Sequence, residues 1–287
     1  MSSLLHGYHV RANGVRLHLL RYGGRGPRML LLPGITSPAI TWGFVAERLA
    51  RHFDVHVLDF RGRGLSSSAP GMDASLDAMA ADVLALLEVQ GWSSVTLLGH
   101  SMGAATVMRI GAQYPDLARA IIMLDPGLGR PGGRGPGAAP AAAAPGRAAQ
   151  PAPGALVMAG SAEALVAQNN RSFDDLAAKC RADSPKWDIV DCQYWALSKK
   201  QYHGPYTEAQ SRAMTGTMST ADALAKITAP ALILKADAPP DVRKANEQAA
   251  SVMQHGKLVH IDGAAHNLHH DQRKRTVQEI TAFLNTL

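Results

Sequence analysis

A five-residue segment, Gly99-His100-Ser101-Met102-Gly103, constrains the fold of this chain more than any other part of the sequence. It follows the apolar run 95–98, which predicts a buried strand, and precedes residues 104–112, which look helical. The two glycines permit a tight, crowded turn that lifts the serine side chain out of the sheet. The following helix directs the positive end of its dipole at the serine, which favours negative charge there. The segment therefore predicts a strand–turn–helix unit with Ser101 at the bend.

Strands and helices alternate on both sides of this unit. Near the N-terminus, two alternating segments flank Asn13-Gly14, a dipeptide that favours the positive φ angles of a hairpin turn. Short apolar runs predict further strands at 29–32, 54–60, 120–124, 231–235 and 258–261. Helical spacing predicts helices at 42–49, 76–87, 242–253 and 276–284. This order predicts an α/β fold with a mostly parallel eight-stranded sheet and helices on both faces.

The alternation fails in the middle of the chain. Residues 126–160 are rich in Gly, Ala and Pro and contain no aromatic residue, which predicts a linker. Residues 161–229 are expected to form an inserted helical cap, and the core then consists of 1–125 and 230–287. The cap aromatics either form the core of the cap or line a substrate pocket, and the sequence leaves both open: Phe173, Trp187, Tyr194 and Trp195.

Charge and cysteine content restrict the partners and the compartment. The net charge is +6, with Arg130, Arg134 and Arg147 in the linker, and no aromatic residues are interleaved with these arginines. We therefore expect a solvated surface rather than a nucleic-acid partner. No apolar stretch is long enough to cross a bilayer, and no secretory signal pattern opens the chain. Cys180 and Cys192 form no metal motif and a poor disulfide framework, so we expect a cytoplasmic protein.

Ser101 needs a base, because a serine hydroxyl is a poor nucleophile. His266 is the candidate, because it follows the last expected strand in a loop of small residues. His269 and His270 are rivals that are expected to fall in the next turn or helix. With Asp271 they suggest a metal site, but no second ligand cluster supports one, so we expect neither metal nor cofactor.

Two carboxylates compete to orient His266. Asp237 follows the strand at 231–235, and Asp125 follows the strand at 120–124. Both strand ends can direct a carboxylate at the same imidazole, and only one is needed. From the residues alone, both assignments stay open.

A serine nucleophile also requires two N–H donors for the oxyanion of a tetrahedral intermediate. The backbone of Met102, directly after the serine, is one candidate. The backbone of Ile35, in the loop after the first parallel strand, is the other. Thr36, Ser37 and Trp42 lie near this loop and are candidates for lining the substrate pocket.

Three segments carry a resemblance to a known family: LLPGITSPAITWGFVAERL at 31–49, VLDFRGRGLSSS at 57–68 and LLGHSMGA at 97–104. They resemble the N-formylmaleamate deformylases, α/β-hydrolases of bacterial nicotinic acid degradation. The resemblance is dense over residues 18–126. It implies hydrolysis of a small acidic amide to formate and maleamate, and it favours Asp125 over Asp237 as the acid of the triad. The linker and Lys235-Ala236-Asp237 depart from the family pattern.

We therefore expect a cofactor-independent hydrolase that cleaves an amide or formamide C–N bond through an acyl-enzyme, in the breakdown of aromatic or N-heterocyclic compounds. A carboxylesterase or a C–C bond hydrolase is the alternative with the same residues, and a non-catalytic small-molecule receptor is the alternative from another class. Arg61 and Arg63 are candidate clamps for a substrate carboxylate, although a structural role in their loop is favoured. The expected partner is a small molecule, with no nucleic acid or membrane, and a homo-oligomer is left open.

Overall fold

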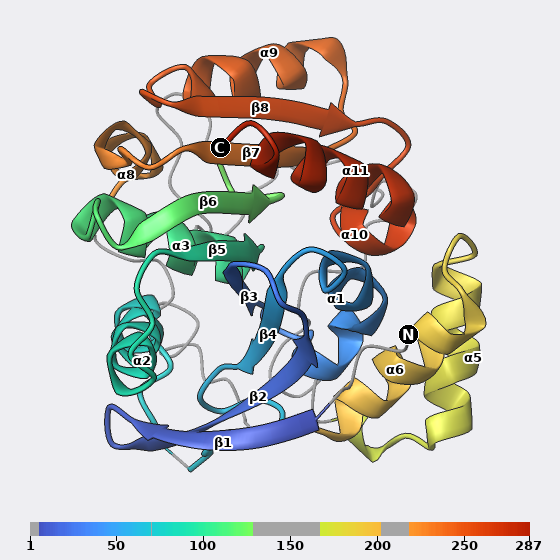
Figure 1. Cartoon of the computed structure of the whole chain (residues 1–287). Coiled ribbons are helices and arrows are strands. Elements are labelled where there is room, and N and C mark those ends of the chain that lie inside the picture. The colour runs from blue at the N-terminus through green and yellow to red at the C-terminus, as the bar shows by residue number, and fades with distance from the viewer. Residues whose placement is uncertain (1–5, 70, 129–166, 202–217) are drawn as a thin grey trace.

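One eight-stranded sheet forms the centre of the computed structural model, which describes residues 6–69, 71–128, 167–201 and 218–287 (Figure 1). The strand order is β1-β2-β4-β3-β5-β6-β7-β8. The strands are β1 His6–Ala12, β2 Val15–Gly23, β3 Arg28–Leu32, β4 Asp54–Asp59, β5 Val95–His100, β6 Ala118–Leu124, β7 Ala231–Ala236 and β8 Gly256–Ile261. Strand β2 pairs antiparallel with β1 and β4, and the remaining pairs are parallel. The predicted mostly parallel sheet is confirmed.

The turn between β1 and β2 has the predicted conformation. Asn13 has a φ of 48° and Gly14 a φ of 73°, and Ala12 pairs directly with Val15. Positive φ at both central residues matches the right-handed twist of the two strands. The antiparallel hairpin therefore begins one edge of an otherwise parallel sheet.

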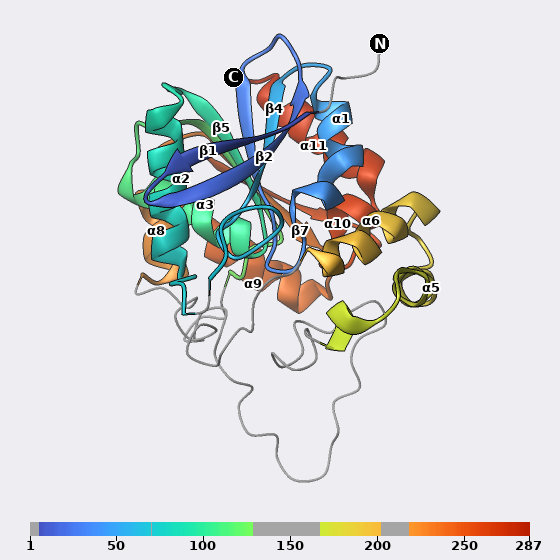
Figure 2. The ribbon, with the colours of Figure 1, turned by 90° about the horizontal axis from the view of Figure 1, so that it is seen from below.

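Helices cover both faces of the sheet (Figure 2). One face packs against α2 Leu76–Val89, α3 Met102–Gln113, α8 Thr220–Lys226 and α9 Pro240–Ala250. The other packs against α1 Gly43–Leu49, α10 Leu268–Asp271 and α11 Arg273–Leu284, with the short 3-10 helix η1 Ala39–Trp42 before α1. Because both faces are covered, the central strands are almost entirely apolar, as the short runs predicted.

The cap is represented by α5 Phe173–Asp183 and α6 Ile189–Lys200, which pack against each other beside the core (Figure 1). They have a small apolar core of their own, which includes Leu176, Trp187 and Trp195. Cys180 of α5 and Cys192 of α6 form a disulfide with a Cα–Cα distance of 5.4 Å. From the sequence, these two cysteines had little weight as a disulfide framework, but the structure pairs them. The sequence spacing did not reveal that the two helices bring them together.

The cap was expected to extend to residue 229, but the last helix in that range packs against the core. Helix α8 contacts α3, and its apolar residues Ala223 and Leu224 belong to the same core cluster as the sheet. We therefore propose that the cap ends before α8. Most of the expected linker, with its three arginines, and the segments 161–166 and 202–217 lie outside the described residues.

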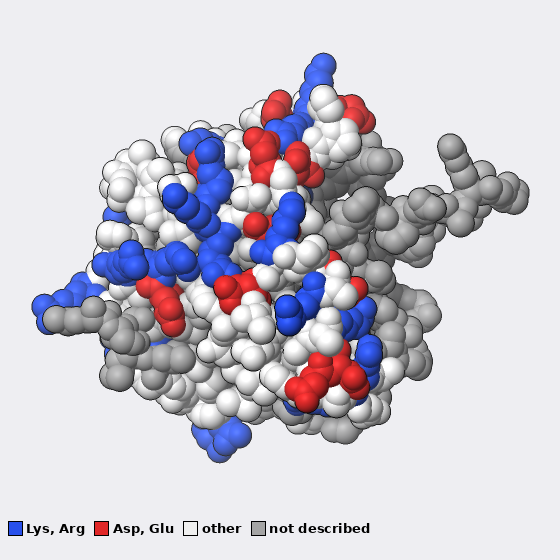
Figure 3. All heavy atoms as spheres, turned by 90° about the vertical axis from the view of Figure 1, so that its right-hand side faces the viewer, with Lys and Arg blue, Asp and Glu red and all other residues white. Residues whose placement is uncertain are grey.

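The cap side of the molecule carries mixed charge. Lys and Arg side chains gather there with Asp and Glu side chains among them (Figure 3). Such mixing is typical of a solvated surface. Within the described ranges, no helix has both the length and the apolarity that a bilayer span requires.

Candidate active site

Ser101 stands at the bend between β5 and α3 with a φ of 52°, a left-handed conformation that is uncommon for a residue with a side chain. The two motif glycines make this bend possible. A Cβ on Gly103 would lie 1.9 Å from the backbone oxygen of Leu32, and a Cβ on Gly99 would lie 2.2 Å from the backbone oxygen of Gly103. Strand β3, strand β5 and helix α3 approach too closely for any other residue at these two positions.

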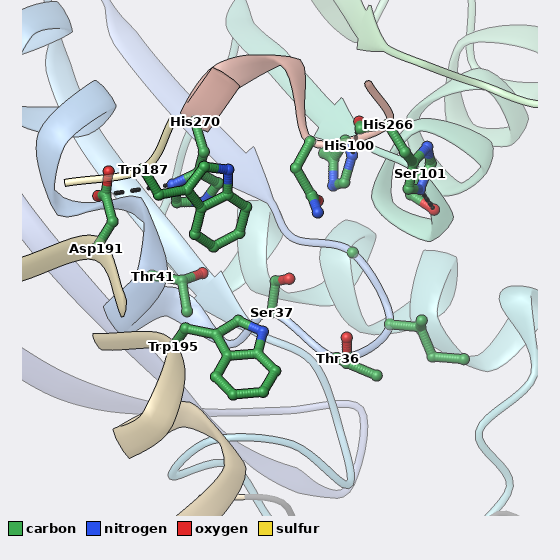
Figure 4. A pocket seen from close by; sticks show the side chains of 13 residues that line it. Thr36, Ser37, Thr41, His100, Ser101, Trp187, Asp191, Trp195, His266 and His270 are labelled. Atoms are coloured by element: carbon green, nitrogen blue, oxygen red, sulfur yellow. Dashed lines mark hydrogen bonds and ion pairs between the residues drawn. The ribbon is translucent and has the colours of Figure 1, made fainter. Parts of the chain in front are cut away.

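The predicted contact between Ser101 and His266 is present. The serine hydroxyl donates to Nε2 of His266 at 3.0 Å (Figure 4). Nδ1 of the same ring lies 2.6 Å from a carboxylate oxygen of Asp125. The carboxylate accepts only, so the imidazole proton lies on Nδ1 and Nε2 is free to accept. Ser101 follows β5, Asp125 follows β6 and His266 follows β8. All three therefore lie at the carboxyl edge of the parallel sheet.

Asp125 is held by several groups. It has a φ of 44°, and one of its carboxylate oxygens accepts from the backbone N–H of Ala236 at 3.1 Å and lies 2.5 Å from Nζ of Lys235. Burial raises the pKa of Asp125, but the hydrogen bond with His266 and the charge of Lys235 outweigh it and hold the pKa well below its ordinary value. The carboxylate therefore stays ionised beside the imidazole.

Asp237 lies away from the histidine. Its carboxylate accepts from the backbone N–H of Gly263 at 2.8 Å and pairs with Arg243 at 2.5 Å. These two contacts lower the pKa of Asp237. Since Gly263 lies in the loop that leads to His266, Asp237 supports that loop from outside and makes no contact with the imidazole.

Three backbone carbonyls of the loop after β3 accept hydrogen bonds, which hold the loop in one conformation. The backbone N–H of Ser37 donates to Gly34, Nε of Arg63 donates to the carbonyl of Ile35, and Nζ of Lys199 donates to the carbonyl of Thr36. Because carbonyl and N–H point in opposite directions across a peptide plane, fixing the carbonyls also fixes the N–H groups. The sequence-predicted oxyanion donors, the N–H groups of Ile35 in this loop and of Met102 at the first turn of α3, keep that role as a prediction.

A pocket opens above Ser101 between the core and the cap (Figure 4). From the core it is lined by Ile35, Thr36, Ser37 and Thr41, together with Ser101, His266 and neighbouring residues. From the cap it is lined by Trp187, Asp191 and Trp195. Thr36 and Ser37 therefore lie where the sequence predicted.

The cap tryptophans serve both of the roles that the sequence left open. Trp187 and Trp195 belong to the apolar core of the cap and also face the pocket. Phe173 is 40 % exposed, and Tyr194 packs edge-on against Phe44 with ring centroids 6.1 Å apart. Neither of these two lines the pocket.

Trp42 does not line the pocket, so that prediction is wrong. Its side chain is fully buried, stacks on His269 at 4.5 Å and lies edge-on to His100 at 6.3 Å. It forms part of the apolar layer beneath the site. Proximity in sequence to the loop after β3 indicated the neighbourhood of Trp42 but not the direction of its side chain.

A histidine that the sequence did not single out supports His266. His100 is almost fully buried, and its Nε2–H donates to the backbone oxygen of His266 at 2.9 Å. Burial, with a smaller effect of the nearby His266, lowers the pKa of His100 to about 3. The neutral ring therefore ties the turn at Ser101 to the loop that carries His266. Only its place inside the serine motif hinted at such a role.

A second unpredicted cluster joins the cap to the core. Asp191 of α6 forms an ion pair with Arg273 of α11, and its other oxygen lies 3.6 Å from Nδ1 of His270. Trp187 stacks on His270 at 4.3 Å, and its indole N–H donates to Asp271 at 2.8 Å. His269 and His270 lie in α10, as expected, and no group of three metal-ligating side chains is found among the described residues.

Arg61 and Arg63 are structural. Arg61 forms a two-pronged ion pair with Asp82 of α2 at 2.6 and 2.5 Å, and Asp82 is fully buried. Arg63 donates to the carbonyls of Ile35 and Arg61. The charge of Arg61 is matched by the buried carboxylate of Asp82, and Arg63 is held by two backbone carbonyls near its own loop, which favours the structural role for both.

Comparison with known proteins shows which family the chain resembles. A model of the alpha/beta hydrolase family matches residues 29–279. An N-formylmaleamate deformylase of Pseudomonas putida KT2440 is 54 % identical over 134 residues, which cover 47 % of this chain and 50 % of that protein. Lipase LipV of Mycobacterium tuberculosis is 37 % identical over 126 residues, which cover 42 % of this chain and 45 % of the lipase. The chain thus spans about half the length of the curated relatives that it matches.

The whole described core is also similar to a solved structure. The crystal structure of an N-formylmaleamic acid deformylase from Pseudomonas putida S16 superimposes with a TM-score of 0.74 at 31 % identity, and covers 96 % of this chain and 100 % of that one. The structure of an E-2-(acetamidomethylene)succinate hydrolase has a TM-score of 0.71 at 20 % identity over 98 % of this chain and 100 % of that one, which shows a shared fold.

Proposed function

The chain belongs to the alpha/beta hydrolase family, and from this premise we propose that it is a serine hydrolase of small amides and formamides, similar to the N-formylmaleamate deformylases. The observation that carries the proposal is the hydrogen-bonded series Ser101–His266–Asp125 beneath a pocket. The likeness to deformylases, 54 % identity over 134 residues and a solved structure that covers 96 % of this chain, supports the choice of a C–N bond.

The first half of the reaction forms an acyl-enzyme. His266 accepts the proton of Ser101 as the serine oxygen attacks the formyl carbon. Asp125 stabilises the imidazolium that results. The N–H groups of Ile35 and Met102 hold the oxyanion of the tetrahedral intermediate. The C–N bond then breaks, and His266 returns its proton to the leaving nitrogen, so the amide leaves neutral and the formyl group stays on Ser101.

The second half releases the acid. A water molecule gives its proton to His266 and attacks the formyl ester. The ester bond to Ser101 breaks as the proton passes back to the serine oxygen. Formate leaves, and the enzyme is ready for another cycle. For N-formylmaleamate, the balance is substrate plus water to formate, maleamate and one proton, which the released formic acid loses to solvent.

The test is release of formate by the purified protein from N-formylmaleamate. We expect Ser101→Ala to reduce kcat by a factor of about 10⁶, as in other serine hydrolases that lose their nucleophile. A fluorophosphonate probe should label Ser101 in the wild type and leave the variant unlabelled. The circular dichroism spectrum of the variant, compared with that of the wild type, shows whether its fold is intact.

Two outcomes contradict the proposal. Rapid alcohol release from esters, with no formate from formamides, identifies a carboxylesterase, a reading to which the partial likeness to a lipase points. Ligand binding by Ser101→Ala, with no turnover or probe labelling in the wild type, identifies a receptor.

A further inference from the structure

Lys199, the penultimate residue of α6, has a buried ammonium group. The residue is 5 % exposed, and its Nζ donates to the backbone oxygen of Thr36 at 3.0 Å. The same atom lies 4.6 Å from the ring centroid of Trp195. Because Thr36 and Trp195 both line the pocket above Ser101, the ammonium lies next to the pocket wall, where the cap meets the loop after β3.

Lys199 has no carboxylate partner among the described residues. The other buried charges beside the pocket are paired: Asp125 with Lys235 and His266, and Asp191 with Arg273. Within the described chain, the site therefore carries one uncompensated positive charge when Lys199 is protonated. Burial, which no acidic side chain of the described residues offsets, lowers the pKa of this lysine to about 7.

Among the described residues, the buried ammonium has one hydrogen-bond acceptor, the carbonyl of Thr36, which is a costly way to make a structural hydrogen bond. Removing the charge from water is unfavourable unless an opposite charge compensates for it. A neutral side chain such as glutamine would satisfy the carbonyl of Thr36 without that cost. The ammonium also has two further N–H donors. An anion bound in the pocket would provide the missing charge and acceptors.

We propose that Lys199 recognises a carboxylate of the substrate and restricts the site to anionic amides and formamides. The carboxylate accepts a hydrogen bond from Nζ at the wall formed by Thr36 and Trp195, while the scissile carbonyl lies at Ser101. The proposal rests on the hydrolase function proposed above, which it deepens by assigning a substrate class. In this proposal, the cap selects anionic substrates through the charge of Lys199, and the core carries out the hydrolysis at Ser101.

The test compares Lys199→Gln, which keeps a donor for Thr36 but removes the charge, with the wild type on two substrates. These are N-formylmaleamate and its neutral methyl ester. We expect KM for the acid to rise about 10- to 100-fold, the range for loss of one charge-assisted hydrogen bond, with a much smaller change in kcat. The values for the ester should stay unchanged. Lys200→Met, on the exposed neighbour of Lys199, is the matched control and should behave as the wild type.

An equal loss on both substrates, or a loss in kcat alone, would show that Lys199 only positions the loop, and would overturn the proposal. Lys199→Arg serves as a second variant with the charge retained, and should keep part of the preference for the acid.

Binding of maleate separates this proposal from the proposed function. In a Ser101→Ala background, calorimetry should detect maleate binding that weakens about 10- to 100-fold when Lys199→Gln is added. If this holds although the wild type releases no formate, the deformylase function fails and the anion site stands. If formate is released but the Lys199→Gln change affects neither KM nor maleate binding, the function stands and the anion site fails.

Discussion

Side chains are positioned by different physical means at the carboxyl edge of the sheet and on the cap wall, which is the face of α6 with Asp191, Trp195 and Lys199. At the sheet edge, Ser101 and Asp125 both have positive φ angles, so the backbone itself is held in an uncommon conformation by close packing around it. On the cap wall, Asp191, Trp195 and Lys199 occupy successive turns of one regular helix, α6. Their positions depend on side-chain contacts with the core, such as the Asp191–Arg273 pair.

The two regions also differ in charge. At the sheet edge the buried carboxylate of Asp125 is matched by Lys235 and His266, whereas on the cap wall the ammonium of Lys199 lacks a carboxylate among the described residues. Matched charges suit a catalytic group that must stay in one state and one place. An unmatched charge suits the recognition of a ligand that brings the opposite sign. We therefore expect changes at the edge to affect kcat and changes on the wall to affect KM.

The largest expected effect is at the edge. Asp125→Asn should lower kcat for formate release by a factor of about ten thousand, because an amide no longer favours the required histidine tautomer or stabilises its charged form. Asp237→Asn, the matched control, should lose little, because Asp237 contacts Gly263 and Arg243 rather than the imidazole. Steady-state kinetics of both variants measure the ratio. A greater loss in Asp237→Asn would reverse the assignment of the acid.

An intermediate effect is expected when either of two ion pairs is broken, one inside the core and one between the core and the cap. Arg61→Met leaves the fully buried Asp82 with only Asn13 as a described side-chain partner, and should reduce the free energy of unfolding by about 3–5 kcal/mol. Arg273→Met removes the partner of Asp191 at the cap and should mainly raise KM and increase hydrogen exchange in α5 and α6. Urea unfolding and hydrogen exchange measure the two effects. Equal global destabilisation by both variants would show that cap and core unfold as one unit.

The smallest expected effect concerns pH. The pKa of Lys199 is about 7 in the folded chain, and about 10.4 in an unfolded one. Between these values the unfolded chain binds more protons, so this group makes the free energy of unfolding rise with pH. Below pH 7 the buried charge opposes folding in full. Lys199→Gln, which lacks this charge, should therefore be more stable than the wild type at pH 6.5, and part of that advantage should be lost by pH 9.

Urea midpoints of the wild type and Lys199→Gln at the two pH values give this difference directly. All other titrating groups are common to both proteins and cancel. Saturating maleate, which favours the charged lysine in the folded state, should reduce the difference between the two pH values. A pH-independent difference between the proteins, with or without maleate, would contradict the lowered pKa.

Much of the core was accessible to prediction because short-range rules govern it. The G-x-S-x-G segment predicted its own turn, since steric limits on five consecutive residues leave few alternatives. Apolar runs predicted the buried strands, and Asn13-Gly14 predicted the hairpin. His266 was predicted from its position after the last strand, and the contact with Ser101 is present. In each case the information lies within a few residues or in the order of the elements.

The rest depended on side chains that are distant in sequence. The residue pattern left Asp125 and Asp237 equivalent, and the resemblance alone favoured Asp125. Their separation in space follows from the path of the loop after β7 and the partners Arg243 and Lys235. The direction of Trp42, the disulfide between Cys180 and Cys192 and the contact of Lys199 with Thr36 likewise followed no local pattern.

Local sequence thus specified many of the backbone conformations that this chain adopts, including the bend that presents Ser101. Which distant side chains converge on Ser101 was a matter of tertiary packing. The physical reason is range: steric and periodic preferences act over a few residues, whereas ion pairs and cavity walls join groups more than a hundred residues apart, whose meeting depends on the whole fold.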